Sequence, residues 1–412
     1  MGNDEMSNTP EYWIWLQTAL GAGARTDEIL AYFESPEELY KAGFREWRLS
    51  GLFTEKRLAA LQKTSLNSAI GVIDECCRKG YEIVTPDDAG YPSNLKNLID
   101  MPLALYVSGD ASVLQKRVCI GIVGTRNASS YGEQTAQKLS YQLASSGAVI
   151  VSGGALGVDS EAHAGAMLAD GKTIAFLGCG LSFDYLKENS GLRRAIARHG
   201  AVVSEFQPNA PASRTTFPIR NRLISGVSLG VVVIEAGVKS GSLVTAKKAY
   251  EQGRDVFAVP GNVTLTSFDG TNHLIRNGAK PVFSAMDVLY EYENEYAEEI
   301  CFDKAESSLS GIKYVDFRNY KKQKAPQKSE ENINTISEKT QPVEKSVCID
   351  DVAADLSDNA KIVYGALDTE PVYFDDIVRK TKLDMNIVLS SLSELEIFGL
   401  AESVSGKRYK KI

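Results

Sequence analysis

Residues 118–132 read VCIGIVGTRNASSYG, and residues 148–159 read AVIVSGGALGVD. Both stretches begin with a short run rich in Val and Ile, continue into a glycine-containing turn, and lead into a sequence with helical periodicity. Runs of this composition are typical of strands that are buried on both faces, as in a parallel sheet covered by helices. The two stretches therefore predict an α/β fold.

The same alternation of strand and helix extends along the middle of the chain. We predict further strands at residues 81–84, 103–107, 173–177, 202–204, 231–235 and 256–259. We predict helices at residues 132–145, 158–168, 191–197, 221–225 and 243–252. Together these elements indicate an extended Rossmann-like, mostly parallel sheet in a core of residues 71–300. Ligands of such sheets bind beyond the carboxyl ends of the strands, so the loops that follow strands are expected to carry the function.

Residues 1–70 precede this core and read as a small helical module of the SAM-like kind. Ser35-Pro36 marks one helix start, because proline is well tolerated at the first helical position. Modules built from helical hairpins sometimes bind the DNA backbone through glycine-containing turns, and more often serve packing or oligomerisation. The sequence leaves both roles open.

Two further regions follow the core. Residues 301–352 are predicted to be a disordered linker, because residues 318–345 within them are polar and nearly free of large apolar side chains. Residues 353–412 read as three helices followed by a short strand pair, which is the pattern of a winged helix. Val388, Leu392 and Leu395 fall on one face of the third of these helices.

The composition limits the class of protein. The chain has 412 residues, of which 24% are charged and 43% hydrophobic, ordinary values for a soluble globular protein. It lacks the long apolar run of a membrane span and the basic and apolar regions of a signal peptide. Six cysteines without a C-x-x-C pair, and only three histidines, argue against a disulfide scaffold or a metal site. We therefore expect a cytoplasmic protein with no membrane contact and no cofactor.

The charge of the chain is distributed unevenly. The net charge of −8 argues against a general binder of polyanions, but local charge matters more for anion affinity. Residues 118–290 hold 16 Lys and Arg against 12 Asp and Glu, whereas residues 291–306 hold seven acids and one lysine. The segment with the predicted sheet is thus the part with a basic bias.

The turn after the first quoted strand contains Gly124, Thr125 and Arg126. Gly124 allows close backbone approach, Thr125 supplies a hydroxyl, and Arg126 supplies a guanidinium that can bind a phosphate in bidentate fashion. The helix N-terminus that follows adds unpaired N–H groups and partial positive charge. We interpret this loop as a phosphate cradle. The alternative is a tight turn that only caps the helix.

Two other turns that follow strands have similar chemistry. Their candidate residues are Ser152, Gly153 and Gly154 after the second quoted strand, and Ser240, Gly241 and Ser242 after the strand at 231–235. We expect the first of these turns to lie beside the phosphate cradle, because consecutive strands of such a sheet are usually neighbours. The second turn is predicted either to bind an anion or simply to cap the next helix.

Asp159 and His163 lie four residues apart on one face of a predicted helix. This spacing could ligate a metal ion. We favour the interpretation of an acid in the first helical turn and a packed histidine, so no metal site is predicted.

Residues 213–222 read SRTTFPIRNR and combine arginines with an aromatic ring. Arginines bind phosphates, and an exposed ring gives a base a face to stack on, worth roughly 1–3 kcal/mol per base. Arg214 and Phe217 are the preferred DNA contacts of this segment. The further candidates are Arg220, Asn221 and Arg222. The alternative is that Phe217 is buried and that the arginines are structural and pair with acids such as Glu235.

On these motifs, the sequence resembles the DprA/Smf family of DNA-processing proteins. The matching segments lie at residues 122–126, 152–159, 204–205, 217–222, 235–246 and 259–261. They extend over the region of residues 80–290, and the helical start and winged-helix end also look like accessory modules of the family. Six motifs in the same order make a chance similarity very improbable.

The resemblance implies an extended Rossmann-like core that binds single-stranded DNA. It further implies that the protein protects incoming DNA during natural transformation, forms a homodimer through its core and loads a RecA-type recombinase. It assigns a phosphate-binding role to Arg126 and, by position, DNA contacts to Arg214 and Phe217. The C-terminal module has 8 basic and 10 acidic residues from Asp355 onward, which favours protein contact or autoregulation over DNA reading.

A second hypothesis is an enzyme. A Rossmann-like hydrolase of nucleotides or nucleoside phosphates could use the same turns, with Glu205 or Glu235 as the acid, an idea that rests on fold analogy alone. The sequence shows no activated nucleophile, metal cluster or working P-loop. We therefore expect no catalytic residues and no enzymatic activity.

Overall fold

The computed structural model describes residues 10–307, 357–397, 400–404 and 408–411. The chain divides into two compact units, residues 1–325 and 326–412. The strands of the first unit are β1 (Glu82–Val84), β2 (Leu105–Gly109), β3 (Cys119–Val123), β4 (Val149–Ser152), β5 (Thr173–Leu177), β6 (Ala201–Ser204), β7 (Gly230–Val233), β8 (Asp255–Ala258) and β9 (Lys280–Pro281).

The helices of the first unit surround this sheet and extend beyond it. They are α1 (Pro10–Leu20), α2 (Asp27–Phe33), α3 (Pro36–Leu49), α4 (Glu55–Lys63), α5 (Leu66–Lys79), α6 (Ser93–Lys96), α7 (Ser130–Ser145), α8 (Val158–Leu168), α9 (Ser190–His199), α10 (Thr216–Val227), α11 (Ser242–Glu251), α12 (Asp269–Arg276), α13 (Met286–Leu289) and α14 (Phe302–Ser307). Short 3₁₀ segments lie at Ala111–Gln115, Lys187–Asn189, Thr266–Phe268 and Tyr290–Tyr292.

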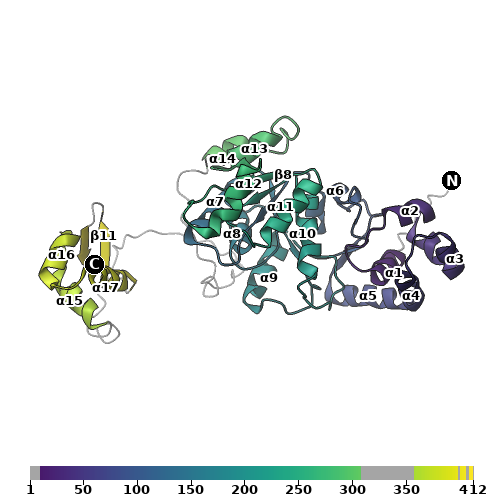
Figure 1. Cartoon of the computed structure of the whole chain (residues 1–412), viewed down its shortest axis with the longest axis horizontal. Coiled ribbons are helices and arrows are strands. Elements are labelled where there is room, and N and C mark those ends of the chain that lie inside the picture. The colour runs from purple at the N-terminus through teal and green to yellow at the C-terminus, as the bar shows by residue number, and fades with distance from the viewer. Residues whose placement is uncertain (1–9, 308–356, 398–399, 405–407, 412) are drawn as a thin grey trace, which may run out of the picture. The chain divides into compact units, whose positions relative to one another are not determined.

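The strands form a nine-stranded sheet in the order β1-β2-β6-β5-β4-β3-β7-β8-β9. Figure 1 shows the N-terminal helices α1 to α5 beside the domain that contains this sheet. From β6 to β9 every neighbouring pair is parallel, whereas β2 pairs antiparallel with both β1 and β6. The mostly parallel, extended Rossmann-like fold expected from the sequence is confirmed. Because β3 and β4 are direct neighbours, the turns that follow them meet at one edge of the sheet.

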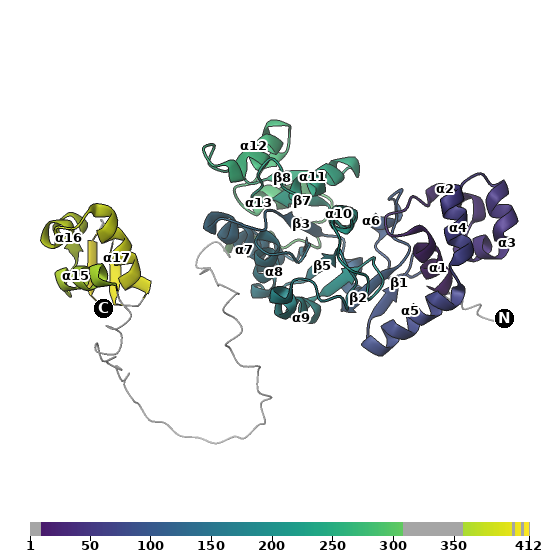
Figure 2. The same ribbon diagram turned by 60° about the horizontal axis from the view of Figure 1, so that its bottom comes forward.

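Both faces of the sheet are covered by helices, which explains the continuous apolar runs. In β3, Ile120 and Ile122 pack in the cluster that contains α7 and α8, whereas Cys119 and Val123 pack in the cluster that contains α10 and α11. Figure 2 shows these helices around the central strands. Alternate side chains of each strand therefore enter two separate cores, and both cores require apolar residues.

Helix α10 begins five residues before the predicted start at residue 221. The sequence Phe217-Pro218 reads as a loop, but proline is compatible with the first turn of a helix, where its missing N–H needs no partner. The consequence is that Phe217 lies in the first turn of α10 rather than on a loop. The remaining predicted strands and helices of the sheet agree with the structure within a few residues at each end.

The N-terminal module consists of α1 to α5 around its own apolar core. Its buried aromatic residues include Trp13, Trp15 and Trp47. The predicted start at Ser35 is confirmed, because the Ser35 side chain accepts a hydrogen bond from the Glu38 N–H at 3.1 Å and Pro36 is the first helical residue. Helix α5 continues to Lys79, beyond the predicted module boundary at residue 70.

The prediction of a disordered linker from residue 301 is wrong at its start. Residues 302–307 form α14, which packs against α7, and Ala305 is buried in the core on that face. The few apolar residues of this segment, such as Phe302, are sufficient to hold it against the sheet domain. The rest of the predicted linker, residues 308–352, lies outside the described residues.

The second unit has the winged-helix pattern expected from the sequence. Its elements are α15 (Asp358–Ala366), β10 (Val372–Tyr373), α16 (Phe374–Thr381), α17 (Met385–Ile397), β11 (Ala401–Val404) and β12 (Arg408–Lys411). Val388, Leu392 and Leu395 are buried together in its core. The sequence analysis missed β10, whose two residues complete a three-stranded sheet in the order β10-β12-β11. Among the described residues of the chain, no helix has the length and apolarity to cross a membrane.

Candidate nucleic-acid interface

The turn after β3 is held in place by its backbone and leaves one side chain free to reach outward. The Thr125 N–H donates to the Glu235 carbonyl at 2.8 Å, and the Thr125 carbonyl accepts from the Val158 N–H at 3.2 Å. Gly124 and Thr125 are half-buried, whereas Arg126 is exposed. Neighbouring elements thus fix the backbone of the Gly-Thr-Arg turn, and the Arg126 guanidinium is available to an anion.

The N-terminus of α7 is already occupied by a carboxylate of the protein. Glu235, which is 1% exposed, accepts hydrogen bonds from the Ser129 N–H at 3.0 Å and the Ser129 hydroxyl at 2.8 Å. The Ser129 side chain in turn accepts from the Gly132 N–H at 3.1 Å as the helix cap. The loop therefore caps the helix, as one interpretation predicted, and still presents one group of the predicted phosphate cradle. Glu235 and Ser129 serve the helix end, which leaves Arg126 rather than the helix N-terminus as the group for a phosphate.

The two glycine-rich turns lie in direct contact, as the sequence analysis expected. Gly157 has a φ of +73°, and a Cβ atom at this position would lie 2.5 Å from the Thr125 carbonyl oxygen and 2.6 Å from that of Arg126. Only glycine allows this approach without moving the turn that carries Arg126.

The predicted contacts Ser152, Gly153 and Gly154 are buried. The Ser152 hydroxyl donates to the Ile122 carbonyl at 2.6 Å, so it joins β4 to β3 and is not presented to a ligand. The Gly153 carbonyl accepts from Arg220. A direct contact of these three residues with DNA is inconsistent with their burial, because the Ser152 hydroxyl and the carbonyls of Gly153 and Gly154 already have partners within the protein.

The first turn of α10 brings an aromatic ring beside Arg126. The Arg126 Cζ atom lies 5.2 Å from the centroid of the Phe217 ring, in the geometry of a cation–π contact. On its other sides, Phe217 contacts Tyr185, with ring centroids 5.4 Å apart, and lies close over Gly178 at the end of β5. Phe217 is half-buried. It is therefore a fixed ring at the carboxyl edge of the sheet, with a guanidinium over it.

Arg214, the other preferred contact, is exposed in the segment that leads into α10. This segment is ordered by a local turn, in which the Ser213 N–H donates to the Thr216 hydroxyl at 3.1 Å and the Thr216 N–H donates to the Ser213 hydroxyl at 3.3 Å. Arg214 thus lies three residues before Phe217 with its side chain in solvent.

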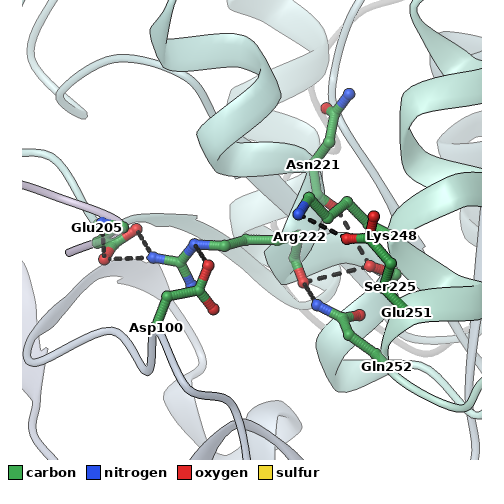
Figure 3. A network of polar contacts seen from close by, with 9 residues as sticks. Asp100, Glu205, Asn221, Arg222, Ser225, Lys248, Glu251 and Gln252 are labelled. Carbon is green, nitrogen blue, oxygen red and sulfur yellow. Dashed lines mark hydrogen bonds and ion pairs between the residues drawn. The ribbon is translucent and has the colours of Figure 1, made fainter. Parts of the chain in front are cut away.

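The two arginines of the Arg-Asn-Arg motif are buried, which is inconsistent with the prediction that they contact DNA directly. Arg220 donates through Nη1 to the carbonyls of Gly153 and Phe176, each at 2.6 Å. Arg222 donates through Nη2 to both carboxylate oxygens of Glu205, each at 2.6 Å (Figure 3). The alternative, that these arginines are structural, therefore describes them better. Arg222 pairs with Glu205 rather than with Glu235, and Arg220 binds backbone carbonyls.

Asn221, between them, is half-buried, and its Nδ2 donates to the Gly241 carbonyl at 3.5 Å. Three consecutive side chains of α10 thus reach three different parts of the domain. Arg220 reaches the ends of β4 and β5, Asn221 reaches the turn before α11, and Arg222 reaches the residue after β6. The motif acts as a clamp that fixes α10 and, with it, Phe217.

Burial changes the pKa values of the charged groups in this clamp. Burial is the main cause that lowers the pKa of Arg220, and Asp159 opposes the change. Burial likewise raises the pKa of Asp159 and of Glu205, while Arg220 and Arg222 respectively act in the opposite direction. The nearby opposite charges therefore favour the charged forms of these buried groups, against the effect of burial.

The turn before α11 is partly accessible. Gly241 is exposed and Ser240 is half-buried, whereas Ser242 is buried, and the two serine hydroxyls lie 2.8 Å apart. Lys239 is exposed in the same turn. The sequence analysis did not select Lys239, although a lysine within a Gly/Ser turn after a strand is a signal for anion binding.

A pocket beside Phe217 was also missed. It is lined by glycines and apolar residues from the ends of β4 and β5 and by Phe183, Tyr185 and Arg193. Arg193 donates through Nη1 to the Leu186 carbonyl at 3.2 Å. Nothing in the local sequence after β5 relates its aromatic residues Phe183 and Tyr185 to Phe217, so the pocket could not be predicted from the sequence.

His163 and Asp159 do not share a ligand site. His163 is buried, and its Nδ1 lies 2.7 Å from the Thr173 hydroxyl. Burial, with a smaller effect from Arg220, lowers the pKa of His163 to about 3. Asp159 accepts from the Ala155 N–H at 3.3 Å. Within the ranges that the structure describes, no group of three or more His, Cys, Asp or Glu side chains could hold a metal ion.

Two segments of the chain match known protein families. Residues 82–293 match the family described as DNA recombination-mediator protein A, and residues 350–407 match the DprA winged helix domain. The chain is 32% identical to Protein Smf of Synechocystis sp. over 424 aligned residues, which cover 100% of both chains. It is 42% identical to DNA processing protein DprA of Bacillus subtilis over 213 residues, or 52% of this chain and 72% of that protein.

A solved structure of DNA processing protein A from Streptococcus pneumoniae is similar in fold. The TM-score is 0.61 at 32% sequence identity, and the match covers 69% of this chain and 98% of that one. The parallel sheet and the turns at its carboxyl edge lie within the segment that matches the first family.

Proposed function

Since the chain belongs to the DNA recombination-mediator protein A family, whose members are also named DprA or Smf, we propose that it binds single-stranded DNA at the carboxyl edge of its sheet. The observation that supports this proposal is the exposed Arg126 guanidinium 5.2 Å from the Phe217 ring. The pair offers a group for a phosphate beside a ring for a base.

A ring and a guanidinium in this arrangement favour an unpaired strand over a duplex. In a duplex, the bases are stacked on one another and their faces are covered, so Phe217 has nothing to stack on. In a single strand, a base can leave its neighbour and lie on the ring once Arg126 moves from the ring to the adjacent phosphate. Arg214 and Lys239, both exposed at turns on this edge, extend the cationic surface for further phosphates.

The resemblance to the family also supports a proposal for the wider role. We propose that the protein acts in the cytoplasm as a homodimer, covers incoming single-stranded DNA during natural transformation and loads a RecA-type recombinase onto it. No membrane contact and no cofactor are part of this role. The winged-helix unit is assigned to protein contact or autoregulation, since its charge does not favour DNA reading.

We propose further that the protein is not an enzyme. The two carboxylates considered for a hydrolase, Glu205 and Glu235, are both buried and hold structural partners. Glu205 binds Arg222, and Glu235 binds Ser129. Neither is presented to a substrate at the edge of the sheet. Robust hydrolysis of a mononucleotide that is abolished by Glu235→Gln would instead support the hydrolase.

The test is a titration of the full chain against oligo(dT) and against a duplex of equal length, by fluorescence anisotropy at several salt concentrations. We expect tighter binding to oligo(dT), with a slope of log affinity against log salt of about −0.7 per phosphate neutralised. Arg126→Ala should weaken binding and make this slope shallower by about 0.7. Equal affinity for both DNA forms, or unchanged binding by Arg126→Ala, would contradict the proposal.

A further inference from the structure

We propose that Gln17, Glu205 and Arg222 are positioning residues that couple the N-terminal helical module to the DNA-binding edge through helix α10. The inference rests on the proposed function, because it is read out as affinity for single-stranded DNA. None of the three side chains needs to touch DNA. Their role is to hold α10 where its first turn presents Phe217.

The first link runs from the module to Glu205. Gln17 lies in α1 and is only 5% exposed. Its Nε2 donates to the Glu205 carbonyl at 2.6 Å, and its Oε1 accepts from the Ala104 N–H at 2.6 Å. The Gly23 N–H, in the turn after α1, donates to the Glu205 carboxylate at 3.1 Å. The module therefore holds both the backbone and the side chain of Glu205.

The second link runs from Glu205 to α10. Both Glu205 oxygens accept from Arg222, and the Arg222 Nε lies 3.5 Å from an Asp100 carboxylate oxygen (Figure 3). The Arg222 carbonyl accepts from Gln252 Nε2 at 3.0 Å. Because Arg222 is 2% exposed, its guanidinium has no water to replace Glu205 if the pair separates.

The third link is the helix itself. Phe217 precedes Arg222 by five residues in α10, or about 7.5 Å along the helix axis. A helix of this length moves as one body, so a displacement at Arg222 reaches Phe217. Arg220 anchors the same segment to the carbonyls of Gly153 and Phe176 at the strand ends. Phe217 thus lies at the start of a helix that Arg220 anchors to the sheet and Arg222 anchors to Glu205, the residue that the module contacts.

The module also touches α10 directly. A Cβ atom at Gly23 would lie 2.9 Å from Cγ2 of Ile219, and Gly23 has a φ of +73°. The turn after α1 is therefore packed on the first half of α10. A movement of the module would change this contact together with the two hydrogen bonds that Gln17 and the Gly23 N–H donate to Glu205. Helix α10 is therefore shared by the contact with the module and by the DNA-binding edge. A shared element couples two sites energetically, and the coupling acts equally in both directions.

The first experiment compares two variants, each of which removes the hydrogen bonds of one side chain between the module and the core. Gln17→Met keeps the size of the side chain and removes its bonds to Glu205 and Ala104. The matched control is Asp87→Ala, which removes the bond from Trp13 Nε1 to Asp87 at 2.6 Å, a contact that does not involve α10. Both full-length proteins are titrated with oligo(dT) over a range of salt, and their thermal unfolding is recorded.

We expect Gln17→Met to bind oligo(dT) at least about fivefold more weakly than the parent, the lower end of the range usual for coupled sites. Asp87→Ala should bind within about twofold of the parent, which separates the α10 route from a general loosening of the module. The salt slope of Gln17→Met should equal that of the parent, because the number of phosphate contacts is unchanged.

A second measurement uses the parent protein alone and holds even if Gln17→Met fails to fold. Hydrogen exchange is followed with and without saturating oligo(dT). By reciprocity, DNA that holds α10 should slow exchange of the Gly23 and Ala104 amides, which lie in this network and outside the DNA edge.

The outcomes separate the inference from the proposed function. If Arg126→Ala loses affinity but Gln17→Met binds like the parent, the coupling is absent and the DNA site stands. If oligo(dT) leaves the exchange of Gly23 and Ala104 unchanged, the coupling is likewise absent. If the parent does not bind oligo(dT), or Arg126→Ala binds as well as the parent, the proposed function itself fails.

Discussion

The guanidinium of Arg126 lies over the ring of Phe217, with 5.2 Å between Cζ and the ring centroid. The two residues come from different halves of the sheet domain. Arg126 follows β3, and Phe217 opens α10 after β6. A cationic group and an aromatic ring therefore lie together at the carboxyl edge, and in the proposed complex they bind a phosphate and a base respectively. Each of them should contribute to a different part of the binding energy.

If the ring binds a base and the guanidinium binds a phosphate, substitutions of Phe217 and of Arg126 should respond differently to DNA that lacks bases. Phe217→Leu keeps an apolar side chain but removes the aromatic face, so it should cost roughly 1–3 kcal/mol on oligo(dT). On an abasic oligonucleotide of equal length it should cost almost nothing. Arg126→Ala should weaken binding to both oligonucleotides by the same factor, because Arg126 contacts phosphate in the proposed complex. Anisotropy titrations of the parent and both variants measure this.

Phe217→Trp serves as the control, since it restores an aromatic face at the same position. It should bind oligo(dT) as the parent does. A Phe217→Leu protein that loses equal affinity for abasic and normal oligonucleotides would show that the ring acts only as packing against Tyr185 and Gly178.

The Arg222–Glu205 pair predicts a stability effect that the exposed Arg126 does not share. Arg222→Met leaves the Glu205 carboxylate buried without its partner and should lower the free energy of unfolding by about 3–5 kcal/mol. Arg126→Ala, at an exposed position, should stay within about 0.5 kcal/mol of the parent. Urea unfolding of the full chain followed by circular dichroism gives both values.

The double variant Glu205→Gln with Arg222→Met removes both charges and should recover part of the loss. If Arg222→Met alone unfolds at the same urea concentration as the parent, Arg222 is not a structural arginine, and its role as part of the α10 clamp would have to be abandoned.

Most of the sheet could be predicted because its strands are buried on both faces. Ile120 and Ile122 on one side and Cys119 and Val123 on the other enter separate cores, so β3 reads as a continuous apolar run. The contact between the two glycine-rich turns followed from the parallel order alone, since the carboxyl ends of neighbouring strands meet.

The partners of the site residues could not be read from the sequence. Arg220 and Arg222 have the composition of a phosphate-binding motif, and only the fold places a strand-end carbonyl and Glu205 opposite them. The N-terminus of α7 likewise reads as an anion site, yet Glu235, more than a hundred residues away, occupies it. Local sequence shows which groups exist, whereas distant residues decide which are already used.

Gly157 offers a test of how closely the two turns must approach. Gly157→Ala places a Cβ against the Thr125 and Arg126 carbonyls at a φ of +73°. The strained backbone alone should cost about 1–3 kcal/mol of stability. Because the Arg126 carbonyl has to move, affinity for oligo(dT) should fall as well. Thermal unfolding and anisotropy on the same sample give the two effects.

Gly241→Ala is the matched control, because Gly241 has a φ of −63° and nothing within 4 Å of an added Cβ. Its stability should stay within about 0.5 kcal/mol of the parent. Equal stability of the two variants would mean that the turns can separate without cost.

His163 makes stability depend on pH in a defined window. Burial, with a smaller effect from Arg220, lowers its pKa to about 3, whereas an unfolded histidine titrates near 6.5. Between these values the unfolded chain binds the proton and the folded chain does not, so stability falls as the pH is lowered through this range. At pH 5 the loss relative to pH 7 should be about 2 kcal/mol from this residue.

The raised pKa values of Asp159 and Glu205 act in the opposite sense, because a folded carboxyl that keeps its proton longer gains stability as the pH falls. The effect of His163 is therefore isolated by comparison with His163→Asn, which can still donate to the Thr173 hydroxyl but does not titrate. The parent should lose more stability between pH 7 and pH 5 than this variant, by about 2 kcal/mol. Identical pH profiles for the parent and His163→Asn would show that His163 becomes protonated within the folded protein at ordinary pH.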